Sequence, residues 1–284
     1  MERVGVVGCG LMGSGIAEVT ARAGARVTVV ERDADALASG KERVERSLAR
    51  AVTSGKMPED EANDVRGQLT YSTDFADLAE CELVVEAVAE NEEIKLDVFR
   101  RIDAAVKDPL AVLATNTSSI PIIKLAMVTK RPEQVIGMHF FNPVPVLRLV
   151  ELISSLLTSP ETTERASAYA SESLHKRVIT SPDRAGFVVN ALLIPYLLSA
   201  IRMLESGFAS AEDIDTGMVV GCAHPMGPLA LSDLIGLDTT LAVAESLYEE
   251  FKEPHLAPPP LLSRMTQAGL MGRKSGQGFY SYRK

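Results

Sequence analysis

Short apolar runs alternate with helix-like stretches through the first half of the chain. Five of these runs predict strands, at Arg3–Val7, Arg26–Glu31, Leu83–Val88, Ala111–Thr115 and Val135–Phe140. Strands that alternate with helical stretches are typical of βαβ units, which build a parallel sheet covered by helices. The first half is therefore expected to be an α/β domain with a doubly wound sheet.

The segment from Ala36 to about Val65 interrupts this alternation. It is long, charged and rich in alanine, and Gly55 and Pro58 mark a turn in its middle. These features predict a helical hairpin that is inserted after the second strand.

The chain becomes helical after Ser159. Residues Glu161–His175 have helical periodicity, and Ser181–Asp183 then breaks the pattern. Everything after Gly186 reads as helix, with breaks that are rich in glycine and proline. We therefore expect the α/β domain over residues 1–182 and an all-α C-terminal domain over residues 183–284.

A long apolar run covers Phe187–Leu204. Its central part, Val188–Leu198, is too short and too interrupted to span a bilayer, so no membrane segment is expected. The run carries more apolar surface than one internal helix of a small domain needs. It predicts a buried helix at a subunit contact, and hence a homodimer built through the second domain.

Composition narrows the possible partners and locations. Of the 284 residues, 46% are hydrophobic and 24% charged, as in an ordinary globular protein, and the net charge of −9 offers no general attraction to nucleic acid. The three cysteines are far apart and the four histidines form no paired ligand spacing, so no metal site is expected. The chain opens directly on the first strand without a signal-peptide pattern, which predicts a soluble, cytoplasmic protein.

A glycine-rich turn follows the first predicted strand and opens a helix-like stretch. Residues Gly8–Gly13 read G-x-G-x-x-G, with Leu11 and Met12 inside the motif. In this motif the first glycine forms the tight turn, and Gly10 lets a pyrophosphate approach the backbone. Gly13 allows the helix to pack closely, and the helix N-terminus supplies free N–H groups. The context predicts a Rossmann-like dinucleotide-binding domain.

Two charged residues at the end of the second strand bear on the choice of cofactor. Glu31 lies about 20 residues beyond the glycines, where an acidic side chain accepts hydrogen bonds from the adenosine ribose. Its charge would oppose a 2′-phosphate, which favours NAD. Arg32 could accept that phosphate, so NADP stays open as the alternative.

His139 is the strongest candidate for acid–base chemistry. It ends a predicted strand, where the catalytic groups of doubly wound sheets collect. Glu151 follows an extended stretch with two prolines and could return beside the imidazole, fixing its tautomer and stabilising its cation. An isolated histidine followed by two phenylalanines is more commonly a satisfied core residue, so the residues alone leave both readings open.

Two further polar residues have ordinary structural alternatives. Ser118, in the segment Asn116–Ser119 after a strand, also fits a helix N-cap. Asn190 lies in an apolar helix and must find a polar partner, which is either protein or substrate.

Taken together, these motifs resemble those of the L-3-hydroxyacyl-CoA dehydrogenase family, and within it the bacterial 3-hydroxybutyryl-CoA dehydrogenases. The matching segments run through the chain in the family's order: Gly8–Gly13, Val85–Asn91, Thr115–Ser119, His139–Pro145, Asp183–Asn190, His224–Pro228 and Gly272–Tyr282. The resemblance implies a Rossmann-like domain with a helical hairpin, followed by a helical domain that supplies the dimer interface.

The resemblance also implies the roles of the site residues. His139 and Glu151 would form the catalytic pair, with Ser118 and Asn190 beside the substrate oxygen. Many relatives carry arginine where this chain has Ala191, so we expect an altered local contact there rather than lost chemistry.

Further positions are expected to contact cofactor or substrate. By the same resemblance, Glu90 and Lys95 would lie near the nicotinamide half of the cofactor. Asn116 is also expected at the cofactor, and Asn142 at the substrate.

The inserted hairpin carries a local excess of positive charge in an acidic protein. Helical spacing places Arg43, Arg46 and Arg50 on one helix face, and Lys41 and Lys56 flank them. Such a stripe suits the phosphates of coenzyme A, and Arg50 and Lys56 are the expected contacts. Because glutamates are interleaved with these bases, a solvated helix face is the alternative.

The expected activity is the reversible oxidation of a (3S)-3-hydroxyacyl-CoA, with a short acyl chain, to the 3-ketoacyl-CoA with NAD. Another Rossmann oxidoreductase, of the β-hydroxyacid dehydrogenase type, would use a lysine on the long helix, but Asn190–Leu204 contains none. A non-catalytic crystallin-like relative would have lost its site residues, yet Ser118, His139, Glu151 and Asn190 are all present.

Overall fold

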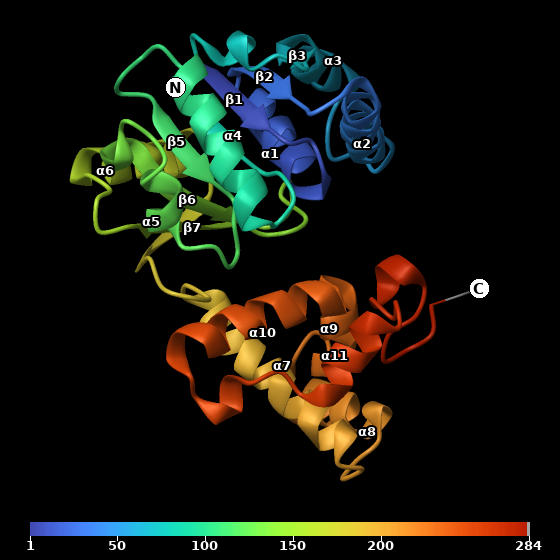
Figure 1. The fold of residues 1–284 in the computed structure, drawn as a ribbon. Helices are drawn as coiled ribbons and strands as arrows, with labels where there is room; N and C mark the ends of the chain where they lie inside the picture. Colours follow the sequence, from blue (N-terminus) through green and yellow to red (C-terminus); the bar gives the residue numbers. More distant parts are fainter. Residues whose placement is uncertain (283–284) are drawn as a thin grey trace. The chain divides into compact units, whose positions relative to one another are not determined.

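The structure is a computed structural model and describes residues 1–282. It divides into two compact units, the first over Met1–Arg184 and the second starting at Ala185 (Figure 1). The division lies two residues beyond the expected boundary after residue 182. Each unit has its own hydrophobic core.

The first unit is built on one eight-stranded sheet in the order β3-β2-β1-β4-β5-β6-β7-β8. Neighbouring strands are parallel except β6 and β7, which are antiparallel. The strands are β1 (Arg3–Val7), β2 (Arg26–Val30), β3 (Leu69–Ser72), β4 (Leu83–Glu86), β5 (Val112–Thr115), β6 (Val135–Phe140), β7 (Leu149–Ser154) and β8 (Arg177–Pro182).

The five expected strands are the central ones. They are covered on both faces, so they read as continuous apolar runs. Three of their ends differ, because β2 ends before Glu31, β4 ends at Glu86 and β5 begins at Val112. The pattern did not predict β3, β7 and β8, which are short, interrupted by polar residues or partly exposed.

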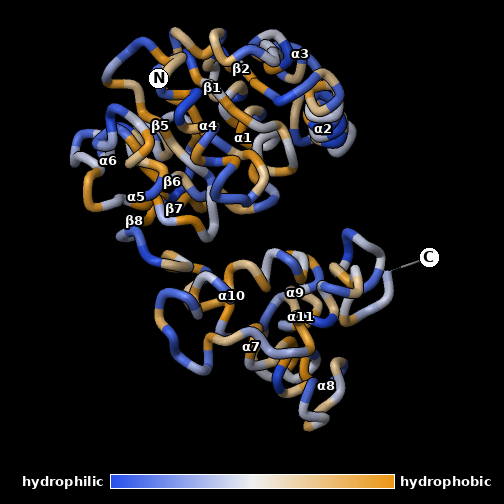
Figure 2. The backbone as a smooth tube through the Cα atoms, in the orientation of Figure 1, coloured by the Kyte–Doolittle hydropathy of each residue, from blue (hydrophilic) through white to orange (hydrophobic). Residues whose placement is uncertain are grey.

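The inserted hairpin consists of α2 (Ala34–Thr53) and α3 (Glu59–Gln68), as expected, with the first helix starting two residues early. It starts at Ala34 because the Asp33 carboxylate caps the helix by accepting a hydrogen bond from the backbone N–H of Ala36. A narrow face of α2 packs into the core through Val44 and Leu48. Figure 2 shows that the rest of this helix is largely hydrophilic, in contrast to the central strands.

The remaining helices of the first unit cover the sheet or connect its strands. They are α1 (Leu11–Arg22), η1 (Phe75–Leu78), α4 (Glu92–Ala105), α5 (Ile122–Ala126), η2 (Pro132–Gln134), α6 (Pro160–Ala168) and the π-helical turn η3 (Tyr169–Ser173). The expected helix over Glu161–His175 is therefore α6 extended by η3.

The second unit is helical over its described residues, which confirms the expected fold class. Its elements are α7 (Val189–Glu205), α8 (Ala211–Thr216), η4 (Gly217–Gly221), α9 (Pro228–Ile235), α10 (Leu237–Phe251), η5 (Pro254–Leu256), α11 (Pro260–Gln267) and η6 (Arg273–Ser275). Leu197, Leu198 and Ile201 of α7 lie in its core. Across residues 1–282, none of the helices is both long and apolar enough to cross a membrane.

Candidate active site

A histidine and a glutamate face each other where β6 and β7 pair. The antiparallel register places His139 opposite Glu151, and His139 Nδ1 lies 2.7 Å from Glu151 Oε2. Both side chains are buried. Because an ionised carboxylate only accepts hydrogen bonds, this contact places a proton on Nδ1 and directs the lone pair of Nε2 away from Glu151.

The other ring nitrogen faces a hydroxyl from the end of a neighbouring strand. Ser118, in the loop after β5, places its Oγ 3.1 Å from His139 Nε2. Asn116, in the same loop, is buried, and its Oδ1 accepts a hydrogen bond from the backbone N–H of Phe140 at 2.8 Å. The loop is thereby tied to the strand that carries the histidine.

Ser118 is not the N-cap that its sequence context also suggested. The helix that follows, α5, begins at Ile122, and its first backbone N–H groups donate to the carboxylate of Asp183. That acceptor comes from a segment 60 residues further along the chain, so local spacing could not reveal it. The Ser118 hydroxyl is therefore turned toward His139.

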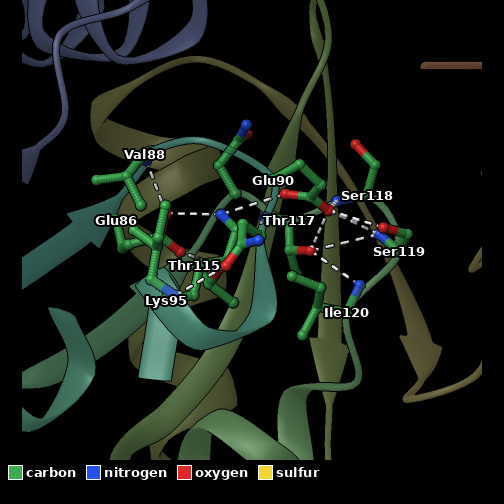
Figure 3. Close-up of polar contacts among 12 residues, drawn as sticks. Glu86, Val88, Glu90, Lys95, Thr115, Thr117, Ser118, Ser119 and Ile120 are labelled. Atoms are coloured by element: carbon green, nitrogen blue, oxygen red, sulfur yellow. Dashed lines mark hydrogen bonds and ion pairs between the residues drawn. The ribbon is translucent and has the colours of Figure 1, made fainter. Parts of the chain in front are cut away.

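A single carboxylate holds the Ser118 loop in place (Figure 3). Glu90 Oε1 accepts hydrogen bonds from Thr117 Oγ1 at 2.5 Å and from the backbone N–H of Ser118 at 2.9 Å. It also accepts from the N–H and hydroxyl of Ser119. Burial alone would raise the pKa of Glu90, but the Lys95 ammonium and these donors hold it below its usual value. Glu90 is therefore an ionised clamp.

The Lys95 side chain lies between two carboxylates rather than in open space. It is 1% exposed, and its Nζ lies 2.6 Å from Glu86 Oε1 and 3.2 Å from Glu90 Oε2. Lys95 therefore acts on the site through Glu90. Our sequence reasoning missed Glu86, although a carboxylate inside the apolar run Leu83–Val88 was a visible signal.

A groove of about 770 Å³ extends along the carboxyl ends of the first strands, and its lining includes Gly8, Gly10 and Glu31. A Cβ on Gly13 would lie 1.8 Å from the carbonyl oxygen of Gly8, so the helix packs against the turn only with glycine there. The space around the Cα of Gly10 is open. These features fit a pyrophosphate at the N-terminus of α1, where Leu11 is exposed and Met12 half-buried.

Glu31 is fixed at the side of the groove. Its Oε1 accepts a hydrogen bond from the backbone N–H of Cys9 at 2.6 Å, and its Oε2 accepts from the N–H of Arg32 at 3.0 Å. The Arg32 side chain is directed to Asp33, at 2.9 Å. The carboxylate therefore stands beside the glycine turn, as a ribose-binding residue requires.

Sequence reasoning missed an aromatic wall of the same groove. The Arg101 guanidinium lies over the Phe75 ring, with its Cζ 3.8 Å from the ring centroid. Both residues line the groove together with Ile94 and Val98. Their positions on η1 and α4 are brought together only by the fold, and the surface they form is of the kind on which an adenine ring stacks.

Cys9, in the middle of the glycine motif, has a packing role. Its side chain fills the space at Gly40 of α2, where a Cβ would lie 2.5 Å from the Cβ of Cys9. Burial, and then the charge of Glu31, raise the pKa of the Cys9 thiol to about 12, so the thiol stays protonated. Cys9 thus joins the hairpin to the turn.

The basic residues of the hairpin have different surroundings in the structure. Arg43 donates to the carbonyl oxygen of Cys9 at 3.3 Å, and Arg46 pairs with Glu42 at 2.6 Å. Arg50 and Lys56 are exposed. The physical reason is that acceptors lie within reach of the first two guanidinium groups.

The two remaining site candidates lie in different units. Asn142 is exposed and lies in the loop after β6, which ends at Phe140. Asn190 is half-buried in the first turn of α7, in the second unit, followed by Ala191. Within residues 1–282, no group of three or more histidine, cysteine, aspartate or glutamate residues is arranged to hold a metal ion.

Comparisons with known proteins identify the family of the chain. Residues 3–184 match the family 3-hydroxyacyl-CoA dehydrogenase, NAD binding domain, and residues 186–282 match 3-hydroxyacyl-CoA dehydrogenase, C-terminal domain. A 3-hydroxybutyryl-CoA dehydrogenase of Mycobacterium tuberculosis is 57% identical over 282 residues, which cover 99% of each chain.

Two solved structures have the same fold over the whole chain. The crystal structure of M. tuberculosis FadB2 has a TM-score of 0.99 at 56% identity and covers 100% of this chain and 99% of that one. The crystal structure of (S)-3-hydroxybutyryl-CoA dehydrogenase PaaH1 from Ralstonia eutropha has a TM-score of 0.94 at 45% identity, with 100% of both chains covered. The chain belongs to the 3-hydroxyacyl-CoA dehydrogenase family and is an NAD-binding oxidoreductase.

Proposed function

We propose that the protein interconverts a short-chain (3S)-3-hydroxyacyl-CoA and the corresponding 3-ketoacyl-CoA, and that His139 and Glu151 are the acid–base pair. The observation that carries this proposal is the buried His139, which lies between Glu151 on one ring nitrogen and Ser118 on the other. The printed names of the bacterial relatives support the short chain, and that of the R. eutropha protein supports the stereochemistry. Family membership argues against the β-hydroxyacid dehydrogenase alternative.

His139 moves the proton in this reaction. In the oxidative direction its Nε2 accepts the proton of the substrate hydroxyl, and in reduction it returns that proton to the keto oxygen. Glu151 stabilises the imidazolium that forms, and the Ser118 hydroxyl orients the reacting oxygen. Bound NAD supplies the hydride acceptor, and NADH the hydride donor. A group of this kind contributes roughly 10²–10⁴-fold to the rate.

The other residues bind and orient. The turn from Gly8 to Gly13 would hold the pyrophosphate, and Glu31 the adenosine ribose. Glu90 would keep the Ser118 loop in register beside the nicotinamide.

Four residues are assigned to the substrate. Asn142 and Asn190 are proposed to hold the acyl group and its oxygen. Arg50 and Lys56 remain the proposed contacts for the phosphates of coenzyme A, since both side chains are exposed.

Reduction of acetoacetyl-CoA by NADH tests the proposed function directly. We expect rapid oxidation of NADH and a product that is the (3S) enantiomer of 3-hydroxybutyryl-CoA, measured by absorbance and chiral chromatography. A long-chain 3-ketoacyl-CoA should react with a lower kcat/KM. Absence of turnover with acetoacetyl-CoA, or formation of the (3R) product, would contradict the proposal.

Cofactor preference should depend on Glu31. Because its carboxylate stands beside the glycine turn, it repels a 2′-phosphate, and kcat/KM should favour NADH over NADPH by about 100-fold. Glu31→Ser should narrow this preference by at least about tenfold, since it removes the repulsion and leaves Arg32 to receive the phosphate. Glu42→Ser, on an exposed glutamate outside the groove lining, is the matched control. Equal use of both cofactors by the wild type would overturn this assignment.

We also propose that the protein is a homodimer built through the second unit. Much of the apolar run in α7 is internal, since Leu197 is 0% exposed and Tyr196 is half-buried, with its hydroxyl 3.2 Å from His224 Nδ1. Leu192 of the same helix is 74% exposed, and Phe208 and Val220 are also exposed. Such apolar exposure fits a surface that a second copy covers.

Leu192→Asp should therefore weaken association without unfolding the unit, because the side chain makes little contact within its own chain. Sedimentation should show a dimer for the wild type and a shift toward monomer for the variant. Leu156→Asp, on an exposed leucine of the first unit, should leave the dimer intact. A wild-type monomer at micromolar concentration would refute the dimer, whereas Leu197→Asp tests only the core.

A further inference from the structure

A fully buried carboxylate lies behind the Ser118 loop. Glu86, the last residue of β4, accepts hydrogen bonds from the backbone N–H of Val88 at 2.7 Å and from Thr115 Oγ1 at 2.7 Å. Its third partner is Lys95 Nζ at 2.6 Å, in an ion pair that is shielded from water on both sides. Figure 3 shows this group next to the contacts of Glu90.

A buried ion pair of this kind adds little net stability to a fold. The cost of removing both charges from water is comparable to the attraction that the pair regains, so neutral apolar residues of similar volume would serve stability as well. The pair does fix the position of the Lys95 ammonium. Glu86 holds the Lys95 ammonium from the sheet side, and the ammonium reaches Glu90 Oε2 on its other side, at 3.2 Å.

A continuous line of contacts connects this pair to the catalytic histidine. Lys95 holds Glu90, and Glu90 Oε1 accepts the backbone N–H of Ser118 at 2.9 Å. The Ser118 hydroxyl then lies 3.1 Å from His139 Nε2. A second link runs through Thr115, whose Oγ1 also accepts the backbone N–H of Thr117 at 3.2 Å.

We propose that Glu86 is a positioning residue for the dehydrogenase reaction, which through Lys95 and Glu90 fixes the turn that aims the Ser118 hydroxyl at His139. This inference rests on the proposed roles of Ser118 and His139. Glu86 touches neither, so its effect is on geometry, and a small displacement of a reacting group is enough to lower the rate strongly.

Glu86→Gln keeps the shape of the side chain and removes its charge. We expect kcat for acetoacetyl-CoA reduction to fall by about 10- to 100-fold, while KM for acetoacetyl-CoA changes less than about threefold. Asp103→Asn is the matched control. It neutralises another buried carboxylate of the same unit, which pairs with Arg131 at 2.8 Å, and it should lower the melting temperature but leave kcat near the wild-type value.

The double variant Glu86→Gln/Lys95→Met separates stability from position. In Glu86→Gln the Lys95 ammonium keeps only its 3.2 Å contact to Glu90. Replacing it with methionine removes this buried positive charge and should restore the melting temperature toward that of the wild type. The rate should stay low, because Glu90 has still lost its anchor. Recovery of kcat together with the melting temperature would show that Glu86 is only structural and would overturn the proposal.

If Glu86→Gln does not fold, the pair Thr115→Val and Thr115→Ser keeps the proposal falsifiable. Valine removes the hydroxyl that joins Glu86 to the turn, and serine retains it. We expect Thr115→Val to lower kcat and Thr115→Ser to restore it. An unchanged kcat in Thr115→Val would overturn the proposal. In either series an inactive wild type would instead refute the proposed function.

Discussion

His139→Gln should lose most of its turnover and keep its fold and its cofactor binding. Glutamine retains hydrogen-bonding groups but cannot take up and release a proton, so kcat should fall by about 10²–10⁴-fold. The cofactor groove is lined by other residues, and the dissociation constant for NADH should therefore stay near the wild-type value. Steady-state kinetics and fluorescence titration with NADH measure the two quantities.

His255→Gln is the control for this variant. His255 is an exposed histidine of the second unit, and its replacement should leave kcat unchanged. Wild-type turnover by His139→Gln would remove His139 from the mechanism. Loss of NADH binding would mean instead that the substitution disturbs the groove and that the rate says nothing about proton transfer.

Glu151→Gln should give the second largest loss of rate. The carboxylate orients the imidazole through the 2.7 Å contact to Nδ1 and stabilises the cation that forms when Nε2 takes a proton. The amide keeps the shape of the side chain without the charge, and it can turn its NH₂ group toward Nδ1, which favours the wrong tautomer. We expect kcat to fall by about 100- to 1000-fold, with a smaller change in KM for acetoacetyl-CoA.

Glu18→Gln is the matched control for a buried glutamate. Glu18 lies inside α1, where burial raises its pKa although Ser47 and Arg22 oppose the shift. Its partners Ser47 and Arg22 are not among the residues of the candidate site, so kcat should stay close to that of the wild type. If Glu151→Gln behaved like this control, the catalytic pair would be refuted.

The fold of the first unit was predictable where local pattern and tertiary role coincide. The strands β1, β4, β5 and β6 are buried on both faces, so each is a continuous apolar run that is visible without neighbours. The strands β3, β7 and β8, at the two ends of the sheet order, do not form such runs. They are short, interrupted by polar residues or partly exposed. In β7 this hid the strand that carries Glu151.

The candidate site also has features that were predictable from the sequence and features that were not. The glycine motif with Glu31, and His139 at the end of a strand, follow from spacing that one βα unit specifies by itself. The hydrogen-bond partner of each polar group does not follow from local spacing. The helix N-terminus near Ser118 is capped by the distant Asp183, and Arg43 donates to the carbonyl oxygen of Cys9.

The sequence by itself therefore determined the class of fold, the glycine-rich turn, the position of the proposed catalytic histidine and, by resemblance, the family. Only the tertiary structure decided how these parts are held. Lys95 is a buried link in the structure because Glu86 and Glu90 approach it from two sides. Hydrophobic period and turn chemistry are local properties and can be read along the chain. The partner of a buried charge depends on which distant segments meet, because burial leaves it no water to bind instead.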